Sequence, residues 1–143
     1  MWDGHGGEKC SQFCSDHISS VLDTHLKRCG PVPDLGKVLS KVIHDLNDSF
    51  AARHDRDGGG ARSSGTTATV ALIRDGYELV VGQVGDSRAL LCRGGRPRPL
   101  TRDHCASDEG ERERIESAGG AVAFDTIGRC GFGSCLCIIA PSP

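Results

Sequence analysis

The sequence predicts an α+β fold, and two observations support this class. Apolar residues recur at helical spacing across residues 7–54, which predicts two amphipathic helices. After residue 65 the composition changes to short β-branched and apolar runs, separated by the tight-turn pairs Asp75-Gly76 and Gly94-Gly95. Strands joined by turns this short pair antiparallel, because a parallel pair needs a much longer crossover.

Length and composition limit the classes of protein to consider. The 143 residues make one domain or part of one, and the hydrophobic share (37%) and charged share (25%) are ordinary for a soluble globular chain. A net charge of -2 and an aromatic share of 4% argue against a nucleic-acid-binding protein. No apolar run is long enough to span a membrane, and no signal peptide follows Met1.

The eight cysteines are irregularly spaced and are not accompanied by a secretory signal. We therefore expect reduced, intracellular thiols rather than a disulfide framework. No Cys-x-x-Cys pair occurs, which argues against a structural zinc site.

The first predicted helix covers about residues 7–28, and the second covers about residues 34–54. His17 and His25 lie along the inward stripe of the first helix, and we interpret them as partly buried structural histidines rather than metal ligands. A Gly-Pro-Val-Pro sequence separates the two helices, and Asp34 is suited to cap the second. The two helices are expected to pack side by side on one face of another layer.

Residues 55–64 form a polar segment with three successive glycines, a feature that phosphate-binding loops share. No strand leads into the segment and no Gly-Lys-Ser/Thr follows it, so we reject a P-loop. We expect a mobile surface loop instead.

The second half of the chain is predicted to begin with strands and to continue with a helix. The predicted strands cover residues 66–73, 77–84, 88–92 and 96–100. Gly85-Asp86-Ser87 is expected to form a turn or bulge between the second and third strands. A charged helix at residues 109–118 then ends at Gly119-Gly120, and one more short strand is expected at residues 121–124.

Two later segments differ from their surroundings in charge. Residues 88–102 are mildly basic through five arginines: Arg88, Arg93, Arg96, Arg98 and Arg102. We interpret this run as a solvated face, although a phosphorylated substrate would also suit it. Residues 130–143 carry no charge and show no helical or strand period, so we expect an unstructured tail outside the domain.

The densest group of chemically active residue types is Asp3-Gly4-His5-Gly6-Gly7. Asp supplies hard oxygen ligands for a divalent cation, His binds metal or moves a proton near neutral pH, and glycine lets the backbone approach a ligand. A flexible polar terminus is the alternative interpretation. Because so dense a motif normally follows a strand, we interpret it as the inner end of one.

Five motifs of this kind occur in order over residues 2–129. They are Asp3-Gly4-His5-Gly6-Gly7, Ser64-Gly65-Thr66-Thr67-Ala68, Val84-Gly85-Asp86-Ser87-Arg88-Ala89, Leu100-Thr101-Arg102-Asp103-His104, and Glu111-Arg112-Glu113-Arg114-Ile115 with Ala118-Gly119-Gly120. In combination they resemble the metal-dependent, type 2C protein serine/threonine phosphatases. Residues 64–104 look most similar to the mitochondrial-matrix members that act on the branched-chain α-ketoacid dehydrogenase complex.

The resemblance implies a central sandwich of two antiparallel sheets flanked by helix pairs, one pair being the two predicted helices. It also implies hydrolysis of phosphoserine or phosphothreonine by a water held between two Mg²⁺ or Mn²⁺ ions. Asp3 then corresponds to the bridging metal ligand, and Gly4 corresponds to a carbonyl ligand. His5 corresponds to the general acid, and Asp86 corresponds to a ligand of a third, weaker metal site.

The sequence departs from the family pattern at both ends. A phosphate-binding arginine and an acidic ligand of the family would precede Met1, and the later metal ligands have no match after residue 129. We therefore expect a partial phosphatase domain at residues 1–129 and a non-matching, disordered tail at residues 130–143. By the same argument we expect a truncated chain that is inactive and unstable on its own.

Two alternative functions remain at this point. The first is a phosphatase-like chain that binds the partners of a parent enzyme without catalysis. The second is a serine esterase, because Gly85 to Ala89 is close to a nucleophile elbow and His5-Gly6-Gly7 is similar to an oxyanion loop. An elbow requires a helix after the serine, whereas a strand is predicted there.

The resemblance also implies partners and a compartment. We expect a phosphoprotein substrate, with the branched-chain α-ketoacid dehydrogenase complex as the candidate, and neither nucleic acid nor a membrane span. The mitochondrial matrix is the expected location, with the cytoplasm or nucleus as alternatives, although the chain contains no targeting segment.

Overall fold

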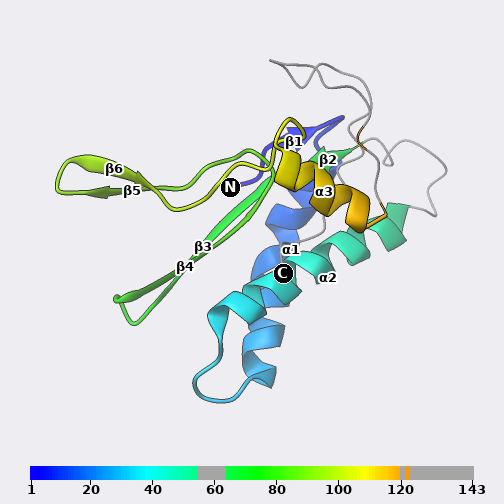
Figure 1. The fold of residues 1–143 in the computed structure, drawn as a ribbon. Helices are drawn as coiled ribbons and strands as arrows, with labels where there is room; N and C mark the ends of the chain where they lie inside the picture. Colours follow the sequence, from blue (N-terminus) through cyan, green and yellow to red (C-terminus); the bar gives the residue numbers. More distant parts are fainter. Residues whose placement is uncertain (55–63, 120–121, 123–143) are drawn as a thin grey trace.

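The computed structural model describes residues 1–54, 64–119 and 122 (Figure 1). In chain order the elements are β1 (Gly4–His5), α1 (Lys9–Arg28), α2 (Leu35–His54), β2 (Gly65–Thr66), β3 (Ala68–Arg74), β4 (Glu78–Val84), β5 (Leu90–Arg93), β6 (Arg96–Pro99) and α3 (Glu109–Ser117). Residues 55–63 of the predicted loop 55–64, most of the predicted strand 121–124 and the whole predicted tail 130–143 lie outside the described residues. None of the described helices is long and apolar enough to cross a membrane.

The strands form three antiparallel ladders, which pair β1 with β2, β3 with β4, and β5 with β6. The mixture of helices and antiparallel strands confirms the predicted fold class. Within the described ranges each ladder has two strands. The turn after β3 uses Asp75 and Gly76 in left-handed backbone conformations, as their sequence predicts.

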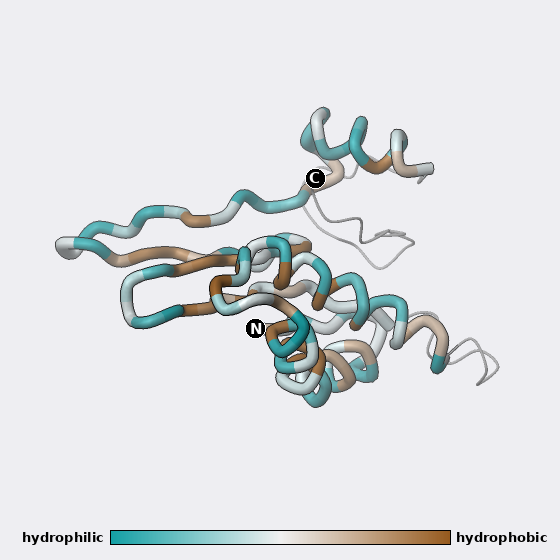
Figure 2. Tube along the Cα trace, turned by 90° about the horizontal axis from the view of Figure 1, so that it is seen from below, coloured by the Kyte–Doolittle hydropathy of each residue, from teal (hydrophilic) through white to brown (hydrophobic). Residues whose placement is uncertain are grey.

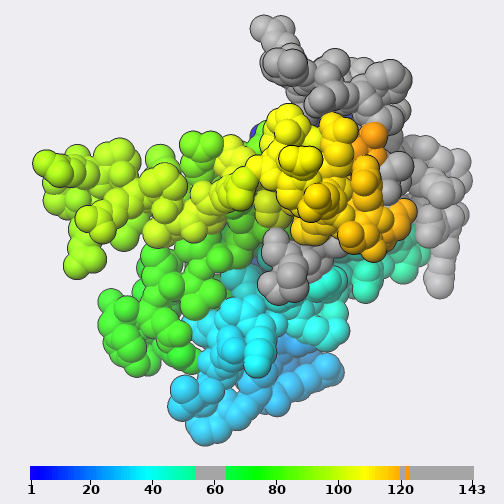
Figure 3. All heavy atoms as spheres, viewed as in Figure 1, coloured from blue at the N-terminus to red at the C-terminus, as the bar shows by residue number. Residues whose placement is uncertain are grey.

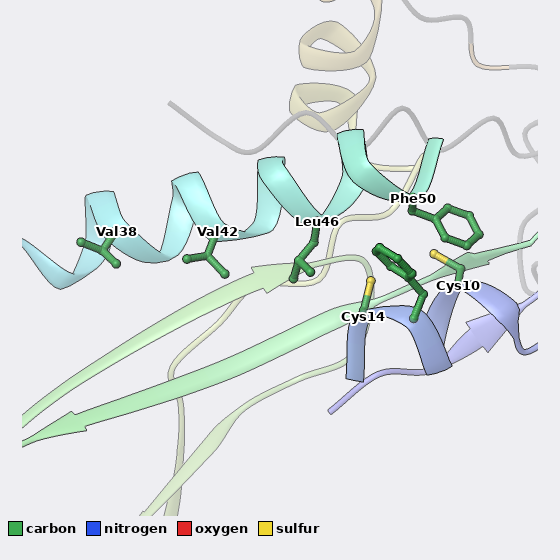
Figure 4. Close-up of a cluster of buried hydrophobic side chains, with 7 residues drawn as sticks. Cys10, Cys14, Val38, Val42, Leu46 and Phe50 are labelled. Carbon is green, nitrogen blue, oxygen red and sulfur yellow. The ribbon is translucent and has the colours of Figure 1, made fainter. Parts of the chain in front are cut away.

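The two long helices pack side by side, as predicted, around a buried apolar cluster (Figure 4). The residues at its centre are Cys10, Phe13, Cys14, Val38, Val42, Leu46 and Phe50. Asp34 caps α2, because its carboxylate accepts a hydrogen bond from the Lys37 amide at 3.1 Å. His25 of α1 bonds Asp45 of α2 at 2.7 Å, which agrees with a structural role for this histidine.

A second apolar cluster joins α2 to the β3–β4 ladder through Leu39, Ile43, Ala68 and Val84. Gly82 of β4 permits this approach, because a Cβ atom there would lie 2.7 Å from Cδ2 of Leu39. Figure 2 shows the two long helices on one side of the strands and the short α3 on the other. The helix pair therefore covers one face of a strand layer, and the same layer carries the candidate site.

Candidate active site

The opening motif lies in an extended segment that pairs with residues 65–69. Gly4 lies opposite Thr66 and His5 opposite Gly65 in the β1–β2 ladder. Before the ladder, the Thr69 amide donates to the Met1 carbonyl at 3.0 Å, and the terminal ammonium donates to the Thr69 carbonyl at 2.7 Å. The motif is thus the end of a strand, as its composition predicts.

Glycines on both strands allow the site residues to pack closely. A Cβ atom on Gly65 would lie 2.4 Å from Nε2 of His5, so the imidazole ring covers this glycine. A Cβ atom on Gly4 would lie 2.7 Å from Oγ of Ser11 at the start of α1. The glycines of both motifs therefore provide the space that the His5 ring and the first turn of α1 occupy.

Buried hydroxyl groups connect the first three motifs. The Thr67 amide donates to the Asp3 carbonyl at 2.9 Å, and the Asp3 amide donates to Oγ1 of Thr67 at 3.2 Å. The same Oγ1 atom lies 2.6 Å from Oγ of Ser87, and Oγ1 of Thr69 donates to the Ser87 carbonyl at 2.8 Å. Thr67 and Ser87 are both buried, so these bonds are shielded from water.

The fourth motif is bonded to the third at the base of the β5–β6 hairpin. Arg88 binds Asp103 through two hydrogen bonds of 2.9 and 2.6 Å, which hold the pKa of Asp103 below its ordinary value. The His104 amide donates to the Gly85 carbonyl at 3.0 Å. This pairing fixes the segment after β6 against the turn that carries Asp86.

The fifth motif contacts the fourth through α3. Nδ1 of His104 lies 3.9 Å from a Glu111 oxygen, and Arg114 bonds the same carboxylate. Hydrogen bonds from Arg114 hold the pKa of Glu111 below its ordinary value. Hydrogen bonds therefore connect the first four motifs, and the contact between His104 and Glu111 connects the fifth, although about 100 positions separate the first from the last.

The predicted site residues differ in how closely the structure brings them together. Asp3, Gly4 and His5 are consecutive on the exposed edge formed by β1. Asp86 is exposed in the turn after β4, and its neighbour Ser87 connects it to Asp3 through Thr67. Sequence reasoning did not identify Thr67 and Ser87 as the connecting residues, although polar residues between apolar strand positions were a usable signal.

The described residues do not fit a metal ion on their own. Within residues 1–54, 64–119 and 122, no group of three or more His, Cys, Asp or Glu side chains is arranged to hold one. Asp3 and Gly4 together offer one carboxylate and one carbonyl, whereas Mg²⁺ requires near-octahedral oxygen coordination. The described residues therefore supply only part of the coordination that such an ion requires.

The geometry excludes the serine esterase alternative. The chain after Ser87 continues into strand β5, whereas a nucleophile elbow requires a helix at that point. The Ser87 side chain is also buried, and its hydroxyl is bonded to Thr67 rather than to a histidine. Ser87 is a structural link between motifs.

Solved structures of known proteins share this fold. A sex-determining protein of C. elegans superposes with a TM-score of 0.74 at 30% identity, over 82% of this chain and 28% of that one. The serine/threonine phosphatase PstP/Ppp of Mycobacterium tuberculosis superposes with a TM-score of 0.58 at 30% identity, over 81% of this chain and 51% of that one.

Sequence comparison also finds protein phosphatases among the relatives of this chain. The chain is 42% identical over 130 residues to mitochondrial protein phosphatase 1K of Xenopus laevis, which covers 90% of this chain and 34% of that protein. It is 34% identical over 131 residues to probable protein phosphatase 2C 71 of Arabidopsis thaliana, which covers 92% and 28%. The chain thus spans about a third of the length of these relatives. Residues 1–130 match the family described as protein phosphatase 2C, and the chain belongs to this family.

Proposed function

We propose that the protein is a metal-dependent protein serine/threonine phosphatase, which removes phosphate from phosphoserine and phosphothreonine with a metal-activated water. The observation that carries this proposal is the bonding of Asp3 to Ser87 through the Thr67 hydroxyl. These bonds hold the segments that carry Asp3 and Asp86 in one network. Membership of the family supports the same chemistry.

The proposed roles of the site residues follow their positions. Asp3 and the Gly4 carbonyl are metal ligands, His5 is the general acid for the leaving hydroxyl, and Asp86 serves a third metal site. The exposure of the Asp3, His5 and Asp86 side chains supports these roles, because solvent ions and substrate reach them. Mg²⁺ and Mn²⁺ prefer oxygen donors of this kind, and a complete site would need further ligands besides Asp3 and Gly4.

For the 143-residue chain itself we propose little or no turnover. The ligand set described above supports this proposal, because one carboxylate and one carbonyl bind a divalent ion weakly. Low stability is part of the same proposal. Large apolar side chains stand exposed on the strands and turns, among them Ile73 (72% exposed) and Tyr77 (80% exposed).

We place the catalytic-type domain at residues 1–129, with residues 130–143 outside it. The family match, which covers residues 1–130, supports this boundary. The proposed substrate is a phosphoprotein of the mitochondrial matrix, with the branched-chain α-ketoacid dehydrogenase complex as the candidate. The 42% identity to mitochondrial protein phosphatase 1K supports this location over the cytoplasm and nucleus.

A phosphate-release assay tests the proposal. A phosphoserine peptide is incubated with Mn²⁺ or with EDTA, using this chain and the longest natural product that contains it. We expect metal-dependent release from the longer product, loss of release in its Asp3→Asn variant, and no release from this chain. Metal-dependent release of phosphate by this chain would support the proposed phosphatase function and would overturn the proposed inactivity of the chain. Absence of release from every product would overturn the function.

A binding role without catalysis is the second candidate, and the incomplete ligand set favours it. Such a chain would compete for the partners of a complete phosphatase. Adding an excess of this chain to a complete family member tests the role with a protein substrate. The binding role would be supported if the chain inhibits dephosphorylation of the protein substrate but does not inhibit dephosphorylation of a small phosphorylated substrate.

A further inference from the structure

The β5–β6 hairpin extends away from the helices and is exposed over its length (Figure 3). In its register Arg93 lies opposite Arg96, and Leu91 lies opposite Arg98. Because side chains alternate between the faces of a strand, Arg93, Arg96 and Arg98 share one face with Leu91. We call these three residues the arginine face.

The arginine face differs from the other two arginines of the basic run. Arg88 is bonded to Asp103, and Arg102 is bonded to Asp108. In the part of the chain that the structure describes, no ion pair involves the arginine face. Like charges that lie directly opposite each other destabilise a ladder, and no acidic side chain of the described residues offsets this cost.

The backbone of β6 is poorly suited to pair with an additional strand. Gly94 and Gly95 both have positive φ, which identifies a two-residue turn whose flanking pair exchanges hydrogen bonds. The alternation of an antiparallel ladder then directs the nitrogens of Pro97 and Pro99 towards the open edge. Neither nitrogen carries a hydrogen, so this edge lacks donors and recognition depends on side chains.

We propose that the arginine face binds an acidic segment of a partner protein. Arg96 and Arg98 are alternate residues of β6, about 7 Å apart along the strand, and Arg93 lies directly across the ladder from Arg96. An extended peptide with alternating carboxylates has the same repeat, and each guanidinium binds a carboxylate through two parallel hydrogen bonds.

A protein partner suits this surface better than a nucleic acid. The hairpin contains no aromatic residue on which a base would stack, and the chain has a net charge of -2. Arginine keeps its charge at every physiological pH, so binding weakens with salt and not with pH in the neutral range. This interaction is separate from phosphatase activity, and it does not depend on a metal.

Fluorescence anisotropy with the full 143-residue chain tests the proposal. The probe is a labelled peptide of alternating glutamate and serine, and a peptide of alternating glutamine and serine is the uncharged control. The variant Arg93→Gln/Arg96→Gln/Arg98→Gln removes the arginine face. The matched control Lys27→Gln/Arg28→Gln/Lys37→Gln removes three exposed positive charges from the helical side. Circular dichroism verifies that both variants keep the helical content.

We expect the arginine-face variant to bind the acidic peptide about tenfold more weakly, which corresponds to three exposed ion pairs. The helical-side control should bind within about twofold of the original chain, and the uncharged peptide should not bind. Equal binding by both triple variants would overturn the proposal. Displacement of the peptide by a single-stranded oligonucleotide of equal charge, at equal or lower concentration, would assign the surface to nucleic acid instead.

Discussion

Asp3 and Thr67 are joined by two hydrogen bonds, one from each amide. The Thr67 amide donates to the Asp3 carbonyl, and the Asp3 amide donates to the Thr67 hydroxyl. The same hydroxyl contacts Ser87, so a single oxygen atom connects three motifs of the candidate site. Because this oxygen is buried, water cannot replace it when it is removed.

Replacing Thr67 by valine should therefore destabilise the fold. The substitution keeps the shape of the side chain but leaves the Asp3 amide and the Ser87 hydroxyl without their partner, at a cost of about 1–3 kcal/mol. The free energy of unfolding in urea measures the loss. Thr24→Val is the matched control, because the Thr24 hydroxyl is exposed and donates to the Ser20 carbonyl of its own helix. The control should change stability by less than about 0.5 kcal/mol, and equal effects would contradict the proposed role of Thr67.

Replacing Gly65 by alanine should displace the His5 side chain. The new methyl group would lie 2.4 Å from Nε2 of His5, and the exposed ring has room to rotate away. The effect on stability should be small, while the NMR signals of the His5 ring shift and broaden. Gly30→Ala is the control, since a Cβ atom there meets nothing within 4 Å. His5 signals that match in both variants would show that Gly65 does not position the ring.

Replacing Gly82 by alanine should weaken the packing of α2 on β4. Leu39 is almost fully buried, and the added methyl group would lie 2.7 Å from its Cδ2 atom. Overpacking of this kind costs about 1–3 kcal/mol, because the buried leucine must leave its rotamer or the helix must move. Thermal unfolding of the variant, beside Gly30→Ala, measures the cost. An unchanged thermal unfolding midpoint would mean that α2 and β4 can move apart at no cost in stability.

The helices and the longer strands could be predicted from sequence because their patterns are local. The apolar stripe places α2 at residues 34–54, and the structure has Leu35–His54. The first helix begins two residues later than predicted, at Lys9, because Gly6 and Gly7 both have positive φ and lie outside the helix. Turn pairs such as Asp75-Gly76 locate the strand ends equally well, since these residues tolerate the left-handed backbone that such a turn requires.

The arrangement of the site could not be predicted in the same way. β1 and β2 contain two residues each, too few to show a period, and about 60 positions separate them in the chain. Their pairing depends on hydrogen bonds such as that between Asp3 and Thr67, which leave no repeating pattern. The basic run could not be divided from sequence either, because the bonds of Arg88 to Asp103 and of Arg102 to Asp108 became visible only in the structure.

The contact between His25 and Asp45 should make the packing of α1 on α2 sensitive to acid. Hydrogen bonds from His25 and then Lys41 hold the pKa of Asp45 below its ordinary value of 3.8. The ionised carboxylate therefore stabilises the fold above the unfolded pKa, and this contribution is lost as the pH falls through the lower folded pKa. The difference in unfolding free energy between the original chain and Asp45→Asn should shrink as the pH falls from about 5 to about 3.

A double-mutant cycle with His25→Gln assigns this pH dependence to the contact between the two helices. The coupling energy between His25 and Asp45 should be favourable near neutral pH and should approach zero in acid, because protonated Asp45 loses its charge. Lys41 also contacts Asp45 at 3.2 Å, so Lys41→Gln is the control that separates the contact within α2 from the contact between helices. A coupling energy that stays constant over the whole range would mean that the ionised form of Asp45 gains nothing from His25.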